Sequence, residues 1–175
     1  MGARKREEQN PSDCWALEDL FASDEQWEKA VEEFPEKMRH FSGFAGHLGE
    51  DGETLLKAMQ TLDDLICAFE RIYVYANQKY HQDTGNGKYQ EMAARTARMS
   101  AQLEHAAAFV EPELLAVPSG RLETFFAEEA GLEAYRRKIG ESLRMKAHIL
   151  SEELERVLAM TGEMARTPEN VFSMF

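Results

Sequence analysis

The amino-acid sequence predicts an all-α protein: a long antiparallel helical hairpin with additional shorter helices. Two observations predict this class. Good helix formers (Ala, Leu, Met, Glu, Lys and Arg) dominate the chain, and strand-like alternation of apolar and polar residues is scarce. In addition, all five prolines fall outside residues 54–110, which leaves an uninterrupted stretch for two long helices. We therefore expect five or six helices and no strand.

The first helix is expected to begin after Ser23. Ser23 and Gln26 form a capping-box pattern, in which side chains bond the free N–H groups of the first turn. Its inner face would carry three apolar side chains, those of Trp27, Val31 and Phe34. Pro35 is expected to kink or end the helix, because proline donates no backbone hydrogen bond. The glycine-bearing stretch 43–52 is predicted to be a loop.

The second helix has the clearest periodicity, with apolar residues in alternating steps of four and three over about three and a half heptads. This seam consists of Leu55, Met59, Leu62, Ile66, Phe69, Tyr73, Ala76 and Tyr80. Leu65 and Ile72 widen it, as expected for a helix with more than one neighbour. Cys67 is predicted to be a small core residue rather than a reactive thiol.

A third helix is expected after a turn at 81–88, which contains Asp, Asn and Gly. Its seam repeats the same steps at Tyr89, Met92, Thr96, Met99, Leu103, Ala106 and Val110. A short turn between two long helices predicts an antiparallel hairpin. Glu111-Pro112 is expected to end this helix, because the residue before a proline is driven out of the helical region, and Pro112 is expected to open the next one.

Shorter helices are expected after Pro118. Their apolar residues are Leu122, Phe125 and Phe126 in one, Leu132, Tyr135, Ile139 and Leu143 in another, and Leu154, Val157 and Leu158 in a third that Ser151 would cap. Thr167-Pro168 has the pattern of a further helix start. Residues 1–14 are expected to be a flexible polar arm, and residues 15–175 are expected to form one helical lobe.

Charge and composition exclude several partners. The formal net charge is -12, and an acidic surface repels nucleic-acid phosphates and anionic membranes. No apolar run approaches the roughly 20 residues that span a bilayer. The two cysteines, Cys14 and Cys67, lack a C-x-x-C spacing, and residues 1–10 lack the apolar core of a secretory signal. We therefore expect a cytoplasmic protein with no nucleic-acid and no membrane partner.

The residues predict no catalytic site and no metal site, and they single out no substrate-channel residue. A helical zinc peptidase carries H-E-x-x-H, and none of the five histidines precedes a glutamate. His148 and Glu152 have the spacing of two ligands on one helix face. A helix start at Ser151 would leave His148 outside that helix, however, and zinc requires at least three ligands. Neither a G-x-S-x-G nucleophile motif nor a phosphate loop occurs.

Four tyrosines occur around the predicted hairpin turn: Tyr73, Tyr75, Tyr80 and Tyr89. One interpretation is that they line a binding groove. The other is that they pack in the core and at the hairpin tip, which is the more common use of such residues.

Six short segments occur in a characteristic order. They are Trp15-Ala16-Leu17-Glu18-Asp19-Leu20-Phe21 with Ser23-Asp24-Glu25-Gln26-Trp27, Phe44-Ala45-Gly46-His47-Leu48, Glu70-Arg71-Ile72-Tyr73-Val74-Tyr75-Ala76, Phe109-Val110-Glu111-Pro112-Glu113-Leu114, His148-Ile149-Leu150-Ser151-Glu152-Glu153, and Asn170-Val171-Phe172-Ser173-Met174-Phe175. Together they resemble the N-terminal lobe of the oligoendopeptidase F family, which comprises thimet-oligopeptidase-like zinc metallopeptidases.

The resemblance implies an all-helical enzyme that cuts short peptides inside a deep channel. The family's H-E-x-x-H motif and downstream glutamate ligand lie further along its chain than this sequence reaches, so no catalytic or zinc-binding residue carries over. The role that carries over is that of a channel wall. The chain by itself would be inactive and without a cofactor, zinc would belong to the parent enzyme, and the partners would be the missing catalytic domain and short peptides.

Two other interpretations stay open: a free-standing helical binding or inhibitory module derived from that lobe, and an unrelated helical adaptor. A separated lobe should expose apolar surface and self-associate, more strongly as salt screens its charge. The expected contributors are Val171, Phe172, Met174 and Phe175, with Leu122, Phe125 and Phe126.

Overall fold

The structure is a computed structural model that describes residues 9–10 and 13–145. This part contains two 3-10 segments and six α-helices: η3 (Leu17–Asp19), α1 (Asp24–Ser42), α2 (Gly52–Gln82), α3 (Gly87–Ala107), α4 (Val110–Ala116), α5 (Ser119–Glu128), η4 (Ala130–Tyr135) and α6 (Arg136–Met145). The described residues contain no strand, so the predicted all-α class is confirmed. None of the described helices is long and apolar enough to cross a membrane.

Several predictions fall outside the described residues. They concern most of the polar arm, the helix capped by Ser151, the helix start at Thr167-Pro168, the His148 and Glu152 pair, and the apolar cluster Val171, Phe172, Met174 and Phe175.

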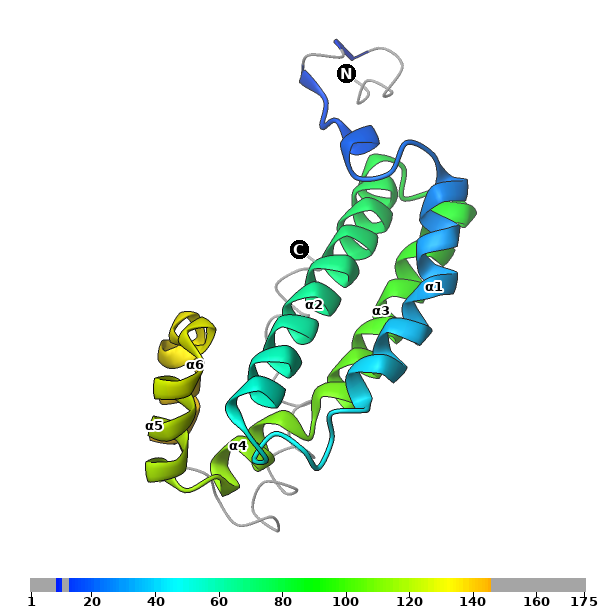
Figure 1. The fold of residues 1–175 in the computed structure, drawn as a ribbon. Coiled ribbons are helices and arrows are strands. Elements are labelled where there is room, and N and C mark those ends of the chain that lie inside the picture. The colour runs from blue at the N-terminus through cyan, green and yellow to red at the C-terminus, as the bar shows by residue number, and fades with distance from the viewer. Residues whose placement is uncertain (1–8, 11–12, 146–175) are drawn as a thin grey trace.

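Helices α1, α2 and α3 lie side by side as a bundle, and α2 and α3 form the predicted antiparallel hairpin (Figure 1). Asn86 ends the turn between them, because its side chain accepts hydrogen bonds from the N–H groups of Lys88 and Tyr89 and so caps α3. The predicted start of α1 is also confirmed, since the Ser23 hydroxyl accepts from the N–H of Gln26 at 3.4 Å. The core of this bundle is built from Leu17, Trp27, Phe34, Phe41, Leu62, Leu65, Ile72, Tyr75, Ala76, Met92, Met99 and Leu103.

A second group of elements packs against the first half of α2. Helix α5 and segment η4 contact α2, while α6 contacts η4 and α4 (Figure 1). Their shared core holds Leu48, Leu55, Ala58, Met59, Leu114, Val117, Leu122, Phe125, Leu132 and Ile139. Two glycines permit this close approach. A Cβ added at Gly131 would lie 2.8 Å from the Leu56 side chain, and one added at Gly52 would lie 3.2 Å from the Phe125 carbonyl oxygen.

Pro35 does not end helix α1, which was one of the two outcomes predicted for it. Helix α1 continues past Pro35 to Ser42, because the fully buried side chains of Phe34 and Phe41 hold the turns on either side of Pro35 against the bundle. Pro35 itself is exposed and removes one backbone hydrogen bond.

Helix α3 ends at Ala107, before the predicted end at Glu111. Pro112 is the third residue of α4, not the first, and is tolerated there because the first four N–H groups of a helix have no intrahelical partner. The break between the two helices lets Phe109 pack on Phe41, with ring centroids 5.3 Å apart.

The heptad seam predicts the buried face of α3 better than that of α2. On α3, Met92, Thr96, Met99 and Leu103 are buried as predicted. On α2, Leu65 and Ile72 are core residues, whereas the predicted seam residue Tyr73 is 43% exposed and Phe69 only partly buried. The physical reason is that α2 changes neighbours along its length, from α5 and η4 near its start to α1 and α3 beyond.

The predicted burial or exposure of three side chains is wrong. Cys67 is exposed rather than a core residue, because it lies on the side of α2 that faces away from α1 and α3. Leu122 and Phe125 do not contribute to an exposed apolar face. They are 2% and 4% exposed, because α5 turns them into the second core, where Phe126 is also partly buried.

Candidate functional site

The first polar cluster lies where α1 begins, α2 ends and α3 begins. We call it the Asp24 junction, and it consists of Asp24, Tyr75, Lys79 and Lys88. The Tyr75 hydroxyl donates to Asp24 Oδ1 at 2.8 Å, and Lys88 Nζ donates to Oδ2 at 2.5 Å. Lys79 Nζ lies 3.6 Å from Oδ1. Asp24 is in the first turn of α1, where the helix dipole also favours negative charge.

The electrostatics of the Asp24 junction keep its carboxylate charged. Burial alone would raise the pKa of Asp24, but the hydrogen bonds from Lys88 and Tyr75 and the charges of the two lysines outweigh burial and lower that pKa below 3.8. Burial, together with the bond to Asp24, raises the pKa of Tyr75. At neutral pH the cluster therefore holds a fixed carboxylate and a neutral phenol, which suits a structural tie between three helices and not proton transfer.

Aromatic and arginine side chains surround this junction. The indole Nε1 of Trp27, a fully buried residue, donates to the carbonyl oxygen of Ile72 at 2.9 Å. Arg71 donates to the carbonyl oxygen of Leu20 at 2.8 Å, and its guanidinium carbon lies 5.6 Å from the Phe21 ring centroid. The segments at 15–27 and 70–76, which carry much of the sequence resemblance, therefore meet here and use their polar atoms to hold α1 on α2.

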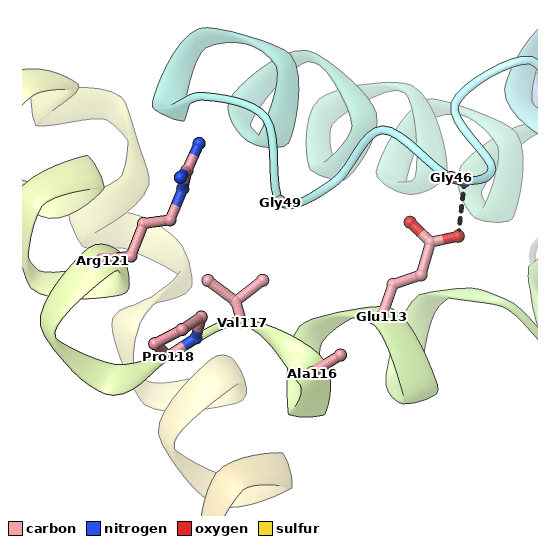
Figure 2. Close-up of a pocket in the computed structure, with 7 residues that line it drawn as sticks. All are labelled: Gly46, Gly49, Glu113, Ala116, Val117, Pro118 and Arg121. Atoms are coloured by element: carbon pink, nitrogen blue, oxygen red, sulfur yellow. Dashed lines mark hydrogen bonds between the residues drawn. The ribbon is translucent and has the colours of Figure 1, made fainter.

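The second polar cluster joins the loop 43–51 to α4 and α5, and we call it the loop junction (Figure 2). The Glu113 carboxylate accepts hydrogen bonds from the N–H of Gly46 at 2.6 Å and of Leu48 at 3.3 Å. Gly46 has φ +87°, a left-handed conformation that glycine adopts without steric cost. Arg121 donates to the carbonyl oxygen of Glu50 at 2.6 Å. The segments 44–48 and 109–114 thus meet at this second junction.

A shallow pocket of about 320 Å³ lies at the loop junction. Its lining residues are Gly46, Gly49, Glu113, Ala116, Val117, Pro118 and Arg121. Figure 2 shows the Glu113 side chain reaching from α4, and that of Arg121 from α5, toward the loop. Both side chains already bond the loop backbone, and none of the described residues that line the pocket is a Ser, Cys, Lys or His. The described part of this arrangement therefore stabilises the loop and offers no nucleophile.

Within the described residues, no group of three His, Cys, Asp or Glu side chains is placed to hold a metal ion. The pair His148 and Glu152 lies outside that part of the chain. The tyrosines do not share one groove. Tyr75 is buried in the Asp24 junction, Tyr73 is 43% exposed, and Lys79 Nζ lies over the rings of Tyr75 and Tyr89. The packing interpretation of these residues therefore fits the structure better.

Sequence reasoning missed the residues that hold both junctions together, chiefly Asp24, Lys88, Glu113 and Arg121. Each of these side chains pairs with a partner more than 50 positions away, and no local pattern encodes such a pairing. One signal was present in the sequence. Asp24 and Glu113 lie inside segments that carry the resemblance, so charged residues in those segments were the places to look.

Comparisons with known proteins give the family. The sequence profile of a family described as Oligopeptidase F matches residues 113–175. The chain is 32% identical over 169 residues to Oligopeptidase PepF of Bacillus subtilis (strain 168), an alignment that covers 97% of this chain and 25% of that protein. It is 35% identical over 150 residues to Group B oligopeptidase PepB of Streptococcus agalactiae, covering 86% of this chain and 25% of that protein.

Solved structures agree with these sequence matches. Oligoendopeptidase-F from Enterococcus faecium aligns with a TM-score of 0.69 at 32% identity, over 85% of this chain and 29% of that chain. A putative peptidase from Chlamydophila abortus aligns with a TM-score of 0.76 over 98% of this chain and 29% of that chain, and its 21% identity shows the fold alone. The chain spans about a quarter of the length of the curated relatives that it matches. By sequence along most of its length and by fold, this chain corresponds to the N-terminal lobe of the oligoendopeptidase F family.

Proposed function

We propose that this chain serves as the N-terminal, channel-wall lobe of an oligopeptide-hydrolysing zinc metalloendopeptidase of the oligoendopeptidase F type, and that it is inactive by itself. One observation carries the proposal. The segments that resemble the family, at 15–27, 44–48, 70–76 and 109–114, all take part in the two junctions, where their polar atoms bond other parts of the same scaffold. The lobe thus contributes a rigid helical wall rather than reacting groups.

The rest of such an enzyme would supply the chemistry. Zinc bound by H-E-x-x-H would activate a water molecule, and short peptides would be the substrates. We assign residues 15–175 to the lobe and residues 1–14 to an arm that precedes it. A cytoplasmic location is part of the same proposal, supported by two free cysteines without the spacing of a redox motif.

A chimera tests this proposal. The chain replaces the region of Bacillus subtilis PepF to which it aligns, and cleavage of a quenched short peptide is measured with and without a zinc chelator. We expect chelator-sensitive cleavage by the chimera and none by PepF with the aligned region deleted. A chimera that binds zinc and shows the helical circular dichroism of PepF but cleaves no peptide would contradict the proposal.

The same materials distinguish the alternative of a free-standing inhibitory module. An inhibitor derived from the lobe would reduce the activity of intact PepF when the free chain is added in excess. We expect no inhibition, because intact PepF already contains its own copy of the lobe.

A further inference from the structure

One side of α2 is covered near its beginning, but none of the described elements covers it further along. Near its beginning, Leu56 packs against Gly131, and the Asp63 carboxylate accepts a hydrogen bond from the Tyr135 hydroxyl at 2.7 Å. Val74 is 18 residues, or five helical turns, beyond Leu56 and therefore lies on the same side of α2. It is 41% exposed. The face that η4 covers at one end of α2 thus continues to the other end, where none of the described elements lies over it.

This part of the α2 face, which no described element covers, carries exposed apolar side chains. Within the segment 70–76, Ile72 and Tyr75 are buried in the bundle, and Arg71, although exposed, donates to the Leu20 carbonyl oxygen. Glu70, Tyr73 and Val74 are exposed as well. Tyr73 and Val74 are two of the four most exposed large hydrophobic residues in the described part of the chain, and they are adjacent. Single exposed hydrophobic residues are ordinary on protein surfaces. Two neighbouring ones that extend a face already used for packing are characteristic of a contact surface.

The Tyr73 side chain is also held in place before any partner arrives. Its ring lies 5.8 Å from that of Phe69, whose ring in turn lies 5.9 Å from that of the fully buried Phe34. An aromatic side chain anchored in this way loses little conformational entropy on binding, which suits the centre of an interface. Glu70 next to it provides a carboxylate that would pair with a basic or hydrogen-bonding group at the rim.

We propose that the outer α2 face, defined by Cys67, Glu70, Tyr73 and Val74, is the surface on which the remainder of an oligoendopeptidase F-type chain packs. This inference rests on the proposed function. The occupant is inferred from the length of the relatives. About three quarters of each of these two proteins lies outside the region that this chain matches. The occupant should present an apolar patch flanked by a Lys, an Arg or another donor facing Glu70.

The exposed thiol of Cys67 gives a direct test that needs no destabilising variant. The free chain and the PepF chimera, both in a Cys14→Ser background, are labelled with a maleimide, and modification of Cys67 is followed by peptide mapping. We expect Cys67 to react at least about tenfold more slowly in the chimera. Equal rates of modification in the free chain and the chimera would overturn the docking face. Protection of Cys67 in the free chain that increases with chain concentration would also overturn it, because a second copy of the chain would then be the occupant.

Substitutions provide the second measurement. Tyr73→Lys and Val74→Lys are compared with Ala97→Lys, which adds the same charge at an exposed position on α3. In the free chain Val74→Lys and Ala97→Lys should change the melting temperature by no more than about 2 °C, and Tyr73→Lys, which loses its ring contact with Phe69, by no more than about 4 °C. In the chimera only the two α2 variants should lower the melting temperature further, by about 3 °C or more beyond their effect in the free chain. A higher KM for the peptide without a change in melting temperature would assign the face to substrate and overturn the proposal.

The two proposals fail in different ways. A folded wild-type chimera without peptidase activity contradicts the proposed function itself. An active chimera in which Cys67 reacts as fast as in the free chain contradicts only the docking face.

Discussion

Replacing Trp27 by Phe tests how α1 is held on α2. The substitution keeps an aromatic ring in a fully buried site but removes the indole donor to the Ile72 carbonyl oxygen. A neutral hydrogen bond of this kind contributes about 1 kcal/mol. The smaller ring leaves about 40 Å³ unfilled, which costs about 1 kcal/mol at roughly 24 cal/mol per Å³. We therefore expect Trp27→Phe to lower the free energy of unfolding by about 2 kcal/mol.

Urea denaturation followed by far-ultraviolet circular dichroism measures this loss, because the helical signal does not depend on tryptophan fluorescence. Trp15→Phe is the matched control, since it makes the same chemical change at a side chain that is 78% exposed. It should alter the free energy of unfolding by less than about 0.5 kcal/mol. The reasoning is refuted if the two variants lose equal stability.

Three further predictions concern the close approaches and the two junctions. Gly52→Ala should lower the free energy of unfolding by about 1–3 kcal/mol, because the added Cβ would press on the Phe125 backbone. Gly87→Ala is the control: Gly87 is also the first residue of its helix but has open space around it, so this variant should be neutral or slightly stabilising. Urea denaturation midpoints compare the two variants. Asp24→Asn should lower the melting temperature at pH 7. Because the pKa of Asp24 is lowered in the folded chain, the stability that its charge contributes is present above pH 3.8 and is lost as the pH falls through the folded pKa. The difference in melting temperature between the variant and the wild type should therefore shrink at that low pH. A difference that does not change with pH would show that the charge is not the cause. Glu113→Gln should lower the free energy of unfolding, measured by urea denaturation, by about 1 kcal/mol, because an amide oxygen is a weaker acceptor than a carboxylate for the two loop N–H groups. A loss near zero would mean that the loop does not depend on this side chain.

The features that sequence predicts well are those encoded locally. The start of α1 follows from the side chain of Ser23, and the antiparallel hairpin follows from two periodic segments separated by a turn that Asn86 closes. Pro35 shows the limit of such reasoning. A local rule predicts that the proline kinks or ends the helix, but buried contacts on both sides of the proline keep α1 continuous to Ser42.

The seam of α2 was only partly predictable, because periodicity identifies an apolar stripe but not the neighbour that each turn will meet. Tyr73 belongs to the stripe and is nevertheless 43% exposed, since α1 and α3 pack on the side that holds Ile72 and Tyr75. The junctions were not predictable at all from spacing. Glu113 and Gly46 are 67 positions apart, and only the folded chain brings the carboxylate to the loop.

We propose that this chain provides a scaffold and no reacting groups. The most direct test measures the zinc content of the purified chain by elemental analysis, together with cleavage of a quenched short peptide with and without a chelator. We expect zinc far below one ion per chain and no chelator-sensitive cleavage. One zinc per chain accompanied by chelator-sensitive cleavage would contradict the scaffold role.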